Sequence, residues 1–269
     1  MTLRSLSAAL ALVVIATGPA LADQLADMTA RGTLRCGVLS VANPFGFQDP
    51  DTREIVGYDV DFCRAVAGEM GLDAEIVPVA VEARIPELQL GNIDILAAAL
   101  GYTAERAEQI DYSDRYFVSR QVVIVAGDST VASLADLDGL RIATNSGSSN
   151  IDYLRNQVPG AEVLTYQDTA AAFLAFAQGR VDGVAISELG TMQLRQQGAI
   201  EFRIVQDPLR IEPWGLGVRK GEASLVAAVN QAMEAMESSG QVETIFNTWF
   251  GPETPFHLTR GFTVGPITQ

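Results

Sequence analysis

The sequence predicts an α/β fold of two lobes, in which helices flank a mainly parallel sheet. Short apolar runs, such as residues 34–39 and 74–79, alternate with segments whose apolar residues recur at helical spacing. Strand-like runs that alternate with helical patterns are typical of βα units, whose strands pair in parallel. The length of 269 residues exceeds the comfortable size of one hydrophobic core, which predicts one large or two medium lobes.

The first 22 residues have the features of a secretory signal peptide. Arg4 supplies the positive end, residues 6–16 form a short apolar run, and residues 20–22 (Ala-Leu-Ala) provide a small-residue cleavage site. That run is too short to span a membrane, and no later stretch approaches the length needed. We expect a mature chain that begins at Asp23 and is exported, soluble and not membrane-embedded; without a cysteine there, no lipid anchor is expected.

The chain is acidic, with a formal net charge of −15 at pH 7 and a pI near 4.4. This charge argues against nucleic acid or anionic lipid as a partner and suits a soluble exported protein. It does not exclude an anionic ligand, because the local field of a pocket can oppose the charge of the whole protein.

Cys36 and Cys63 are the only cysteines, and an exported chain meets an oxidising compartment. We expect them to form a disulfide, which would close a loop of 63 − 36 = 27 residues; the alternative is two free buried thiols. A metal site is less favoured, because His257 is the only histidine and no spacing unites it with the cysteines. We expect no metal and no other cofactor.

The elements of the first third follow from their periodicity. Residues 34–39 predict the first strand and residues 41–47 a loop. A helix is predicted from residue 57 onwards, with Gly71 as its stop, and residues 74–79 predict the next strand. Residues 84–90 read as an amphipathic helix that leads into another strand.

A site for a small anion is predicted where the strand at residues 93–99 meets the following helix. Small residues in the turn at residues 100–102 leave backbone N–H groups exposed beside a helix N-terminus, for which Thr103 is a suitable cap. Arg106, one turn later, adds a planar, permanently charged fork that can bind a carboxylate in two places. We predict a receptor site for a small anion or zwitterion.

The lobe boundaries are predicted from two strand-like stretches, residues 121–125 and 215–218, that flank the middle third of the chain. If both cross between the lobes, residues 121–213 form an inserted second lobe. Residues 23–120 and 214–269 then form the two parts of the first lobe.

A weak internal echo fits this organisation. Residues 90–95 and 178–184 share a glycine helix stop, a spacer, an apolar residue and then Asp. Duplication of a lobe plan and chance explain the echo about equally well.

The motifs, taken in chain order, resemble the polar-amino-acid solute-binding proteins of bacterial ABC importers. The resemblance covers essentially the whole mature chain, and its implied fold is that of the periplasmic binding proteins, with two α/β lobes joined by two hinge strands that close on a ligand. The motifs are residues 57–62 (Gly-Tyr-Asp-Val-Asp-Phe), Thr103-x-x-Arg106, residues 111–116 (Asp-Tyr-Ser-Asp-Arg-Tyr), residues 137–139 (Leu-Asp-Gly), residues 179–182 (Gly-Arg-Val-Asp) and residues 249–251 (Trp-Phe-Gly). The placement of the two cysteines is similar to that of the general amino-acid receptors.

The resemblance also implies a ligand site. The position of Arg106 pairs with the ligand α-carboxylate in such receptors, and Gly147, Ser148 and Ser149 match the helix start that holds the same group. Arg84, in an Arg-Ile-Pro sequence similar to that of the glutamate and aspartate receptors, matches a residue that binds a side-chain carboxylate. The alternative for Arg84 is a solvent-facing residue on a helix surface.

Several positions depart from the family pattern. Ser187, followed by Glu188, stands where many members place an Asp that binds the ligand ammonium, and Ala99 and Gly101 replace frequent hydroxyl residues. Ala42 replaces a frequent stacking ring. Recognition of a carboxylate survives these changes, whereas recognition of an α-amino group is weakened unless Glu188 or Asp182 turns inward. We expect an acidic amino acid or a carboxylate that is not a standard amino acid.

The predicted function is a periplasmic receptor, expected to be a monomer, that delivers its ligand to the transmembrane subunits of an ABC permease. One alternative is a ligand-sensing module for a signalling partner. Another is a dehydratase-like enzyme on the same fold, disfavoured because no nucleophile–base pair is readable and Glu188 is the one plausible acid–base group.

Overall fold

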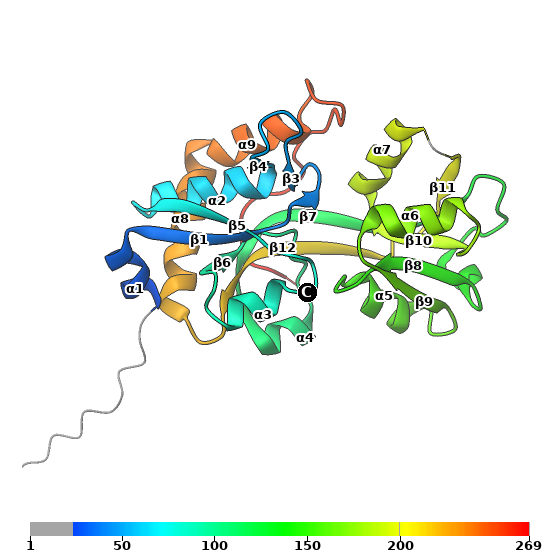
Figure 1. Ribbon diagram of the computed structural model, residues 1–269, viewed down its shortest axis with the longest axis horizontal. Helices are drawn as coiled ribbons and strands as arrows, with labels where there is room; N and C mark the ends of the chain where they lie inside the picture. Colours follow the sequence, from blue (N-terminus) through cyan, green and yellow to red (C-terminus); the bar gives the residue numbers. More distant parts are fainter. Residues whose placement is uncertain (1–23, 199, 269) are drawn as a thin grey trace, which may run out of the picture.

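The computed structural model describes residues 24–198 and 200–268 (Figure 1). The predicted signal peptide, residues 1–22, and the expected first mature residue, Asp23, lie outside the described residues. Within the described part of the chain, no helix has both the length and the apolar character needed to cross a bilayer.

Two α/β lobes lie side by side, joined by two long antiparallel strands, β7 (Ile110–Ala126) and β12 (Arg210–Arg219) (Figure 1). These two hinge strands carry one mixed sheet through both lobes, in the order β5-β1-β6-β12-β7-β10-β8-β9, with β11 (Phe202–Ile204) also paired to β7. The other strands of this sheet are β1 (Thr33–Val38), β5 (Asp73–Pro78), β6 (Ile95–Leu96), β8 (Arg141–Asn145), β9 (Glu162–Tyr166) and β10 (Gly183–Ser187). The predicted two-lobed architecture with two hinge strands is confirmed.

Helices cover the sheet in both lobes. The first lobe, built on β1, β5 and β6, carries α1 (Gln24–Arg31), α2 (Tyr58–Glu69), α3 (Arg84–Gln89), α4 (Ala104–Gln109), α8 (Ala223–Ser239) and α9 (Gln241–Phe250). The second lobe, built on β8, β9 and β10, carries α5 (Asn150–Gln157), α6 (Thr169–Ala177), α7 (Glu188–Gln197) and the short 3-10 helix at Leu134–Leu137. A small antiparallel sheet of β2 (Val41–Ala42), β3 (Gly46–Gln48) and β4 (Ile55–Val56) belongs to the first lobe.

The two lobes repeat one plan. In the first, β1-α2-β5-α3-β6 gives the strand order β5-β1-β6, and in the second, β8-α5-β9-α6-β10 gives the order β9-β8-β10, with parallel pairing throughout. The chain returns through β12 to the first lobe, where α8 and α9 pack against α2.

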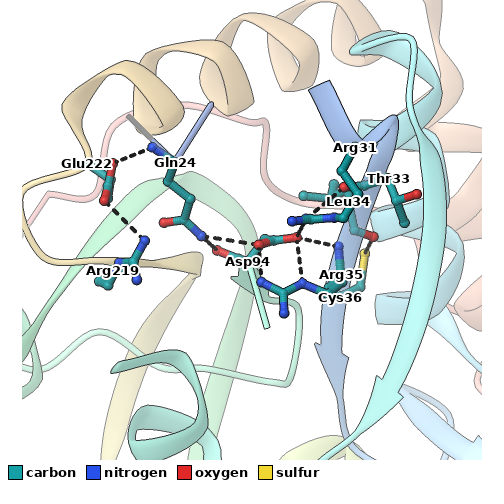
Figure 2. Close-up of polar contacts among 9 residues, drawn as sticks. All are labelled: Gln24, Arg31, Thr33, Leu34, Arg35, Cys36, Asp94, Arg219 and Glu222. Atoms are coloured by element: carbon teal, nitrogen blue, oxygen red, sulfur yellow. Dashed lines mark hydrogen bonds and ion pairs between the residues drawn. The ribbon is translucent and has the colours of Figure 1, made fainter. Parts of the chain in front are cut away.

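The sequence echo marks equivalent positions in this repeat. Asp94, before β6, accepts hydrogen bonds from the Arg35 backbone N–H (2.8 Å) and from Arg35 Nη2 (2.7 Å), as Figure 2 shows. Asp182, before β10, accepts from the Arg141 backbone N–H (2.9 Å) and from Arg141 Nη2 (2.8 Å). The same side-chain clamp therefore joins equivalent strands in both lobes, which favours the repeated plan over chance.

Two predicted elements differ in extent from the structure. The strand expected at residues 93–99 is limited to Ile95–Leu96, because Ala99 has a φ of 47°, in the left-handed region that no strand includes. The first hinge strand, expected at residues 121–125, spans Ile110–Ala126. Its first part was missed because residues 110–120 mix buried and half-buried positions and do not form an apolar run.

The predicted disulfide between Cys36 and Cys63 is present and joins β1 to α2 inside the first lobe. Both residues are fully buried in a core that also holds an aromatic cluster reaching from Phe250 on α9 through Phe117 on β7 to Trp214 on β12. The hinge strands are thus anchored in the core of the first lobe.

Candidate functional site

A cleft lies between the lobes, at the ends of the parallel strands where the following helices begin. Its cavity has a volume of about 170 Å³ and is lined by residues of both lobes and of both hinge strands. Ligands of open α/β sheets bind at this carboxyl edge of the strands. Among the described residues that line it, the charged ones are Arg84, Arg106 and Glu212.

Arg84 begins α3 and points into the protein, with 5% of the residue exposed. The alternative of a solvent-facing helix-surface residue is therefore wrong. Within the described residues, its guanidinium donates only to backbone carbonyl oxygens: Nε to Val81 (2.8 Å), Nη1 to Ala98 (2.9 Å) and Ala99 (3.2 Å), and Nη2 to Gly147 (3.0 Å).

Arg106 on α4 is half-buried and approaches the same place. Its Nη1 donates to the Gly101 carbonyl (2.8 Å) and its Nη2 to the Gly147 carbonyl (2.9 Å). Because a guanidinium has five N–H donors, Arg106 keeps more of them free for a ligand than Arg84 does. Within the described residues, neither guanidinium has a salt bridge, although both face a shared cleft.

Burial lowers the pKa of Arg84 to about 9, and the positive charge of Arg106 beside it lowers that pKa as well. A buried cation next to another cation is destabilised in its charged form unless an anion lies nearby. The site is therefore suited to an anion that touches both guanidinium groups.

The second lobe contributes the start of α5. The backbone N–H groups of Gly147 and Ser149 donate no hydrogen bond to another group in the described chain, and both Ser148 and Ser149 line the cleft. The Ser148 hydroxyl accepts from the Asn150 N–H (3.2 Å), and the Ser149 hydroxyl donates to Glu212. Free N–H groups at a helix N-terminus complement a carboxylate.

The remaining predicted residues of the first lobe have supporting positions. Thr103 caps α4, its hydroxyl accepting from the Arg106 N–H (3.2 Å), and it does not line the cleft. Ala99 lines the cleft, whereas Gly101 lies behind it and offers its carbonyl to Arg106. A Cβ at Gly101 would lie 2.0 Å from Glu212 Oε1, so no hydroxyl-bearing residue fits there beside that carboxylate.

Ser187 and Glu188 separate in the structure. Ser187 lines the cleft and caps α7, its hydroxyl accepting from the Gly190 N–H (3.1 Å). Glu188 is not among the lining residues; it pairs with Arg120 Nη1 at 2.7 Å. Asp182 is bonded to Arg141 and does not line the cleft either, so neither acidic residue that the sequence left open turns inward as an ammonium partner.

Glu212 on β12 is the charged cleft residue that sequence reasoning missed. It is 2% exposed, and its carboxylate accepts from Trp214 Nε1 (2.7 Å), Gln121 Nε2 (3.0 Å), the Tyr153 hydroxyl (2.9 Å) and the Ser149 hydroxyl. Within the described residues it has no salt bridge. The sequence feature that could have pointed to Glu212 is that it is the one acidic residue in the mainly apolar stretch that forms the second hinge strand.

A second buried carboxylate shapes the cleft from inside the first lobe. Asp59 is fully buried and accepts from the Tyr116 hydroxyl (2.7 Å) and from the Ala99 N–H (2.7 Å). Burial raises the pKa of Asp59 to about 7. By holding Ala99 in its left-handed conformation, Asp59 fixes the two carbonyls, of Ala98 and Ala99, that orient Arg84.

No three His, Cys, Asp or Glu side chains converge to hold a metal ion in the described ranges. The arrangement at the cleft is one of hydrogen-bond donors and fixed charges, typical of recognition of a small polar molecule.

Comparison with known proteins gives one consistent answer. The family model of the bacterial extracellular solute-binding proteins, family 3, matches residues 34–252. The chain is 29% identical over 231 residues to the ABC transporter glutamine-binding protein of Bacillus subtilis (strain 168), covering 84% of each chain.

Solved structures agree. An ancestral arginine-binding protein bound to arginine has a TM-score of 0.76 and 34% identity, covering 82% of this chain and 99% of that one. The ancestral amino acid-binding protein AncCDT-1, a precursor of cyclohexadienyl dehydratase, has a TM-score of 0.76 and 29% identity, covering 84% of this chain and 99% of that one. Together with the family match over most of its length, these similarities show that the chain belongs to the bacterial extracellular solute-binding proteins of family 3.

Proposed function

We propose that the protein is a monomeric periplasmic receptor that binds an acidic amino acid, or a related small carboxylate, and delivers it to an ABC-type permease. The observation that carries the proposal is the meeting of Arg84 and Arg106 at one cleft wall, with no salt bridge to either guanidinium in the described residues. Two cationic forks in a closed cleft favour a ligand with an acidic group for each.

In this proposal Arg106 is the dominant contact of the α-carboxylate, because most of its donors are free. The N–H groups at the start of α5, beside Ser148 and Ser149, bind the same carboxylate from the second lobe. Arg84 receives the second acidic group of the ligand. Ser187 and Ala99 lie on the cleft wall around these contacts, and Thr103 and Gly101 position Arg106.

Binding is coupled to closure of the lobes. We assign residues 121–213 to the second lobe and residues 23–120 and 214–269 to the first, with β7 and β12 as the hinge. A ligand that touches both lobes binds the closed form better and shifts the population toward it by that difference in affinity. Small-angle scattering should then show a smaller radius of gyration with saturating ligand.

Two of the relatives named above are a glutamine-binding and an arginine-binding protein, so the acidic preference proposed here differs from their ligands. Its physical basis is the charge of the described cleft wall: the guanidinium groups of Arg84 and Arg106 face the cleft, and Glu212 is the one acidic residue among the lining residues, because Glu188 is paired with Arg120. A cationic group on the ligand beyond its ammonium would find no second carboxylate among these lining residues, and an uncompensated buried polar group costs about 1–3 kcal/mol.

A thermal-shift and calorimetric panel of glutamate, aspartate, glutamine, arginine, leucine and cystine tests the proposal. Glutamate or aspartate should raise the melting temperature most. A larger stabilisation by a neutral or cationic amino acid would overturn the acidic preference while leaving the receptor function intact. Binding of none of these compounds would count against the function itself.

The similarity to AncCDT-1 makes a dehydratase-like enzyme the alternative to test. Product analysis after incubation with candidate carboxylates distinguishes the two, because a receptor returns its ligand unchanged. If the protein binds its ligand unchanged but the liganded form does not bind an ABC permease, the result would favour the ligand-sensing module instead.

A further inference from the structure

An amino-acid ligand brings an ammonium group into the cleft, and the expected partner of that group is missing. Ser187 stands at the end of β10 without a charge, and its hydroxyl already accepts from the Gly190 N–H. The carbonyls of Ala98 and Ala99, at the edge of the first lobe, accept from Arg84. A different part of the cleft must therefore balance the ammonium, if the ligand has one.

Glu212 supplies the negative charge. It is the acidic residue among those that line the described cleft, and its negative charge acts on Arg84, whose pKa it raises against the effect of burial. The cleft thus carries two positive charges and one negative charge. An acidic amino acid carries two negative charges and one positive charge, the complementary set.

The four donors on Glu212 are of two kinds. Gln121 Nε2 and Trp214 Nε1 are held by the hinge strands and both donate to Oε2. Ser149 and Tyr153 donate to Oε1 through hydroxyls, which rotate freely about their C–O bonds and also accept hydrogen bonds. An ammonium can therefore take the place of a hydroxyl proton on Oε1, and the released hydroxyl can donate to the ligand.

A free acceptor lies next to this carboxylate. Because Glu212 can only accept, Gln121 must turn its Nε2 toward Glu212 and its Oε1 toward Asn150, whose Nδ2 donates to it at 3.2 Å. These hydrogen bonds fix the orientation of Asn150 and leave its Oδ1 without a hydrogen-bond partner among the described residues, although Asn150 is only 4% exposed and lines the cleft. A buried acceptor without a partner costs free energy until a donor reaches it.

We propose that Glu212, together with Asn150 oriented through Gln121, forms the subsite that recognises the ligand's amino group. Recognition of the ammonium has moved from the end of β10 to the second hinge strand. Gly101 makes room for it, because a Cβ at that position would overlap the Glu212 carboxylate. The subsite rests on the proposed receptor function and deepens it by requiring an amino group.

The test is a two-by-two comparison of ligand and variant, measured by calorimetry. The first pair of ligands is glutamate and glutarate; glutarate keeps both carboxylates but lacks the amino group. The second pair is glutamine and glutaramate, which differ in the same way. The variant is Glu212→Gln, and the matched control is Glu222→Gln, which removes the same charge from the first lobe beside Gln24 and Arg219 (Figure 2). Wild-type protein should bind glutamate at least about tenfold more tightly than glutarate.

Glu212→Gln should weaken glutamate binding by about tenfold or more and leave glutarate binding unchanged or tighter, because a negative charge that repels the dicarboxylate is gone. A merely structural role for Glu212 predicts equal weakening of both ligands, and that outcome would overturn the subsite. Equal affinity of wild-type protein for glutamate and glutarate would do the same without any variant, so poor folding of Glu212→Gln leaves the test intact. If no ligand of either pair binds wild-type protein, the receptor function fails rather than the subsite.

Discussion

Arg84 and Arg106 donate to the same backbone oxygen, that of Gly147, at 3.0 and 2.9 Å. Gly147 belongs to the second lobe and both arginines to the first, so this one carbonyl links the lobes across the cleft. The contact places two cations at the point where the lobes meet. In the proposed receptor, lobe closure and anion recognition would therefore depend on the same side chains.

Loss of the Arg106 side chain should weaken ligand binding most. Truncating one partner of a desolvated, charge-assisted pair costs about 2–5 kcal/mol, so Arg106→Ala should lower affinity by orders of magnitude. Calorimetry with the best ligand of the panel measures this. Arg64→Ala is the control, because Arg64 is an exposed residue of α2 that pairs with Asp61 away from the cleft. An Arg106→Ala affinity within a few-fold of wild type would refute the assignment.

A methyl group at Gly147 should hinder closure. Its Cβ would lie 2.9 Å from Glu82 Cα of the first lobe, and the residue has a φ of 72°. Gly139 in the second lobe has a similar φ of 74° with nothing within 4 Å of an added Cβ. Both Gly→Ala changes carry comparable backbone strain.

We therefore expect Gly147→Ala to weaken ligand binding by about tenfold or more and Gly139→Ala to leave it nearly unchanged, since only the former obstructs the closed form. Scattering of the Gly147→Ala protein should show little ligand-induced compaction. Equal effects of the two substitutions on affinity would show that strain, rather than contact between the lobes, explains the loss.

Asp59 should make stability depend on pH. Its folded-state pKa of about 7 lies above the ordinary value of 3.8, so the folded state holds this proton more tightly than the unfolded state. The stabilisation is complete below the ordinary pKa, declines as pH rises, and is lost above about pH 7. Across this range the contribution is of the order of a few kcal/mol.

Asp59→Asn removes the titrating group, and with it the pH-dependent contribution of Asp59 to the free energy of unfolding, but keeps an acceptor for the Ala99 N–H. Denaturant unfolding between about pH 4 and pH 8 should therefore show a smaller decline in stability with rising pH for the variant than for wild type. Parallel pH profiles for the two proteins would contradict the raised pKa of Asp59.

The disulfide should be complete in protein recovered from an oxidising compartment. Intact mass before and after reduction with alkylation measures it, and two alkylatable thiols in unreduced, unfolded protein would be the contrary result. Reduction should lower the free energy of unfolding by roughly 3–4 kcal/mol for a loop of 27 residues in the chain-entropy model. The double variant Cys36→Ala, Cys63→Ala should be insensitive to the reductant.

The sequence by itself determined the features that depend on local pattern. Apolar runs that alternate with helical patterns predicted the α/β lobes. Thr103, as a helix cap, predicted the helix that carries the guanidinium of Arg106. Two cysteines in a chain expected to be exported predicted the disulfide. Each of these is legible within a short stretch, because periodicity, capping and composition act between near neighbours in the chain.

Only the tertiary structure decided which distant residues share the cleft. Glu212 meets Ser149, 63 positions away, and Gln121, 91 positions away, because the sheet brings β12, β7 and the start of α5 together. The same packing pairs Glu188 with Arg120 and buries Arg84 against backbone carbonyls of both lobes. Such contacts depend on strand order and lobe closure, which no local pattern encodes; the charge balance of the cleft therefore emerged only when the chain was folded.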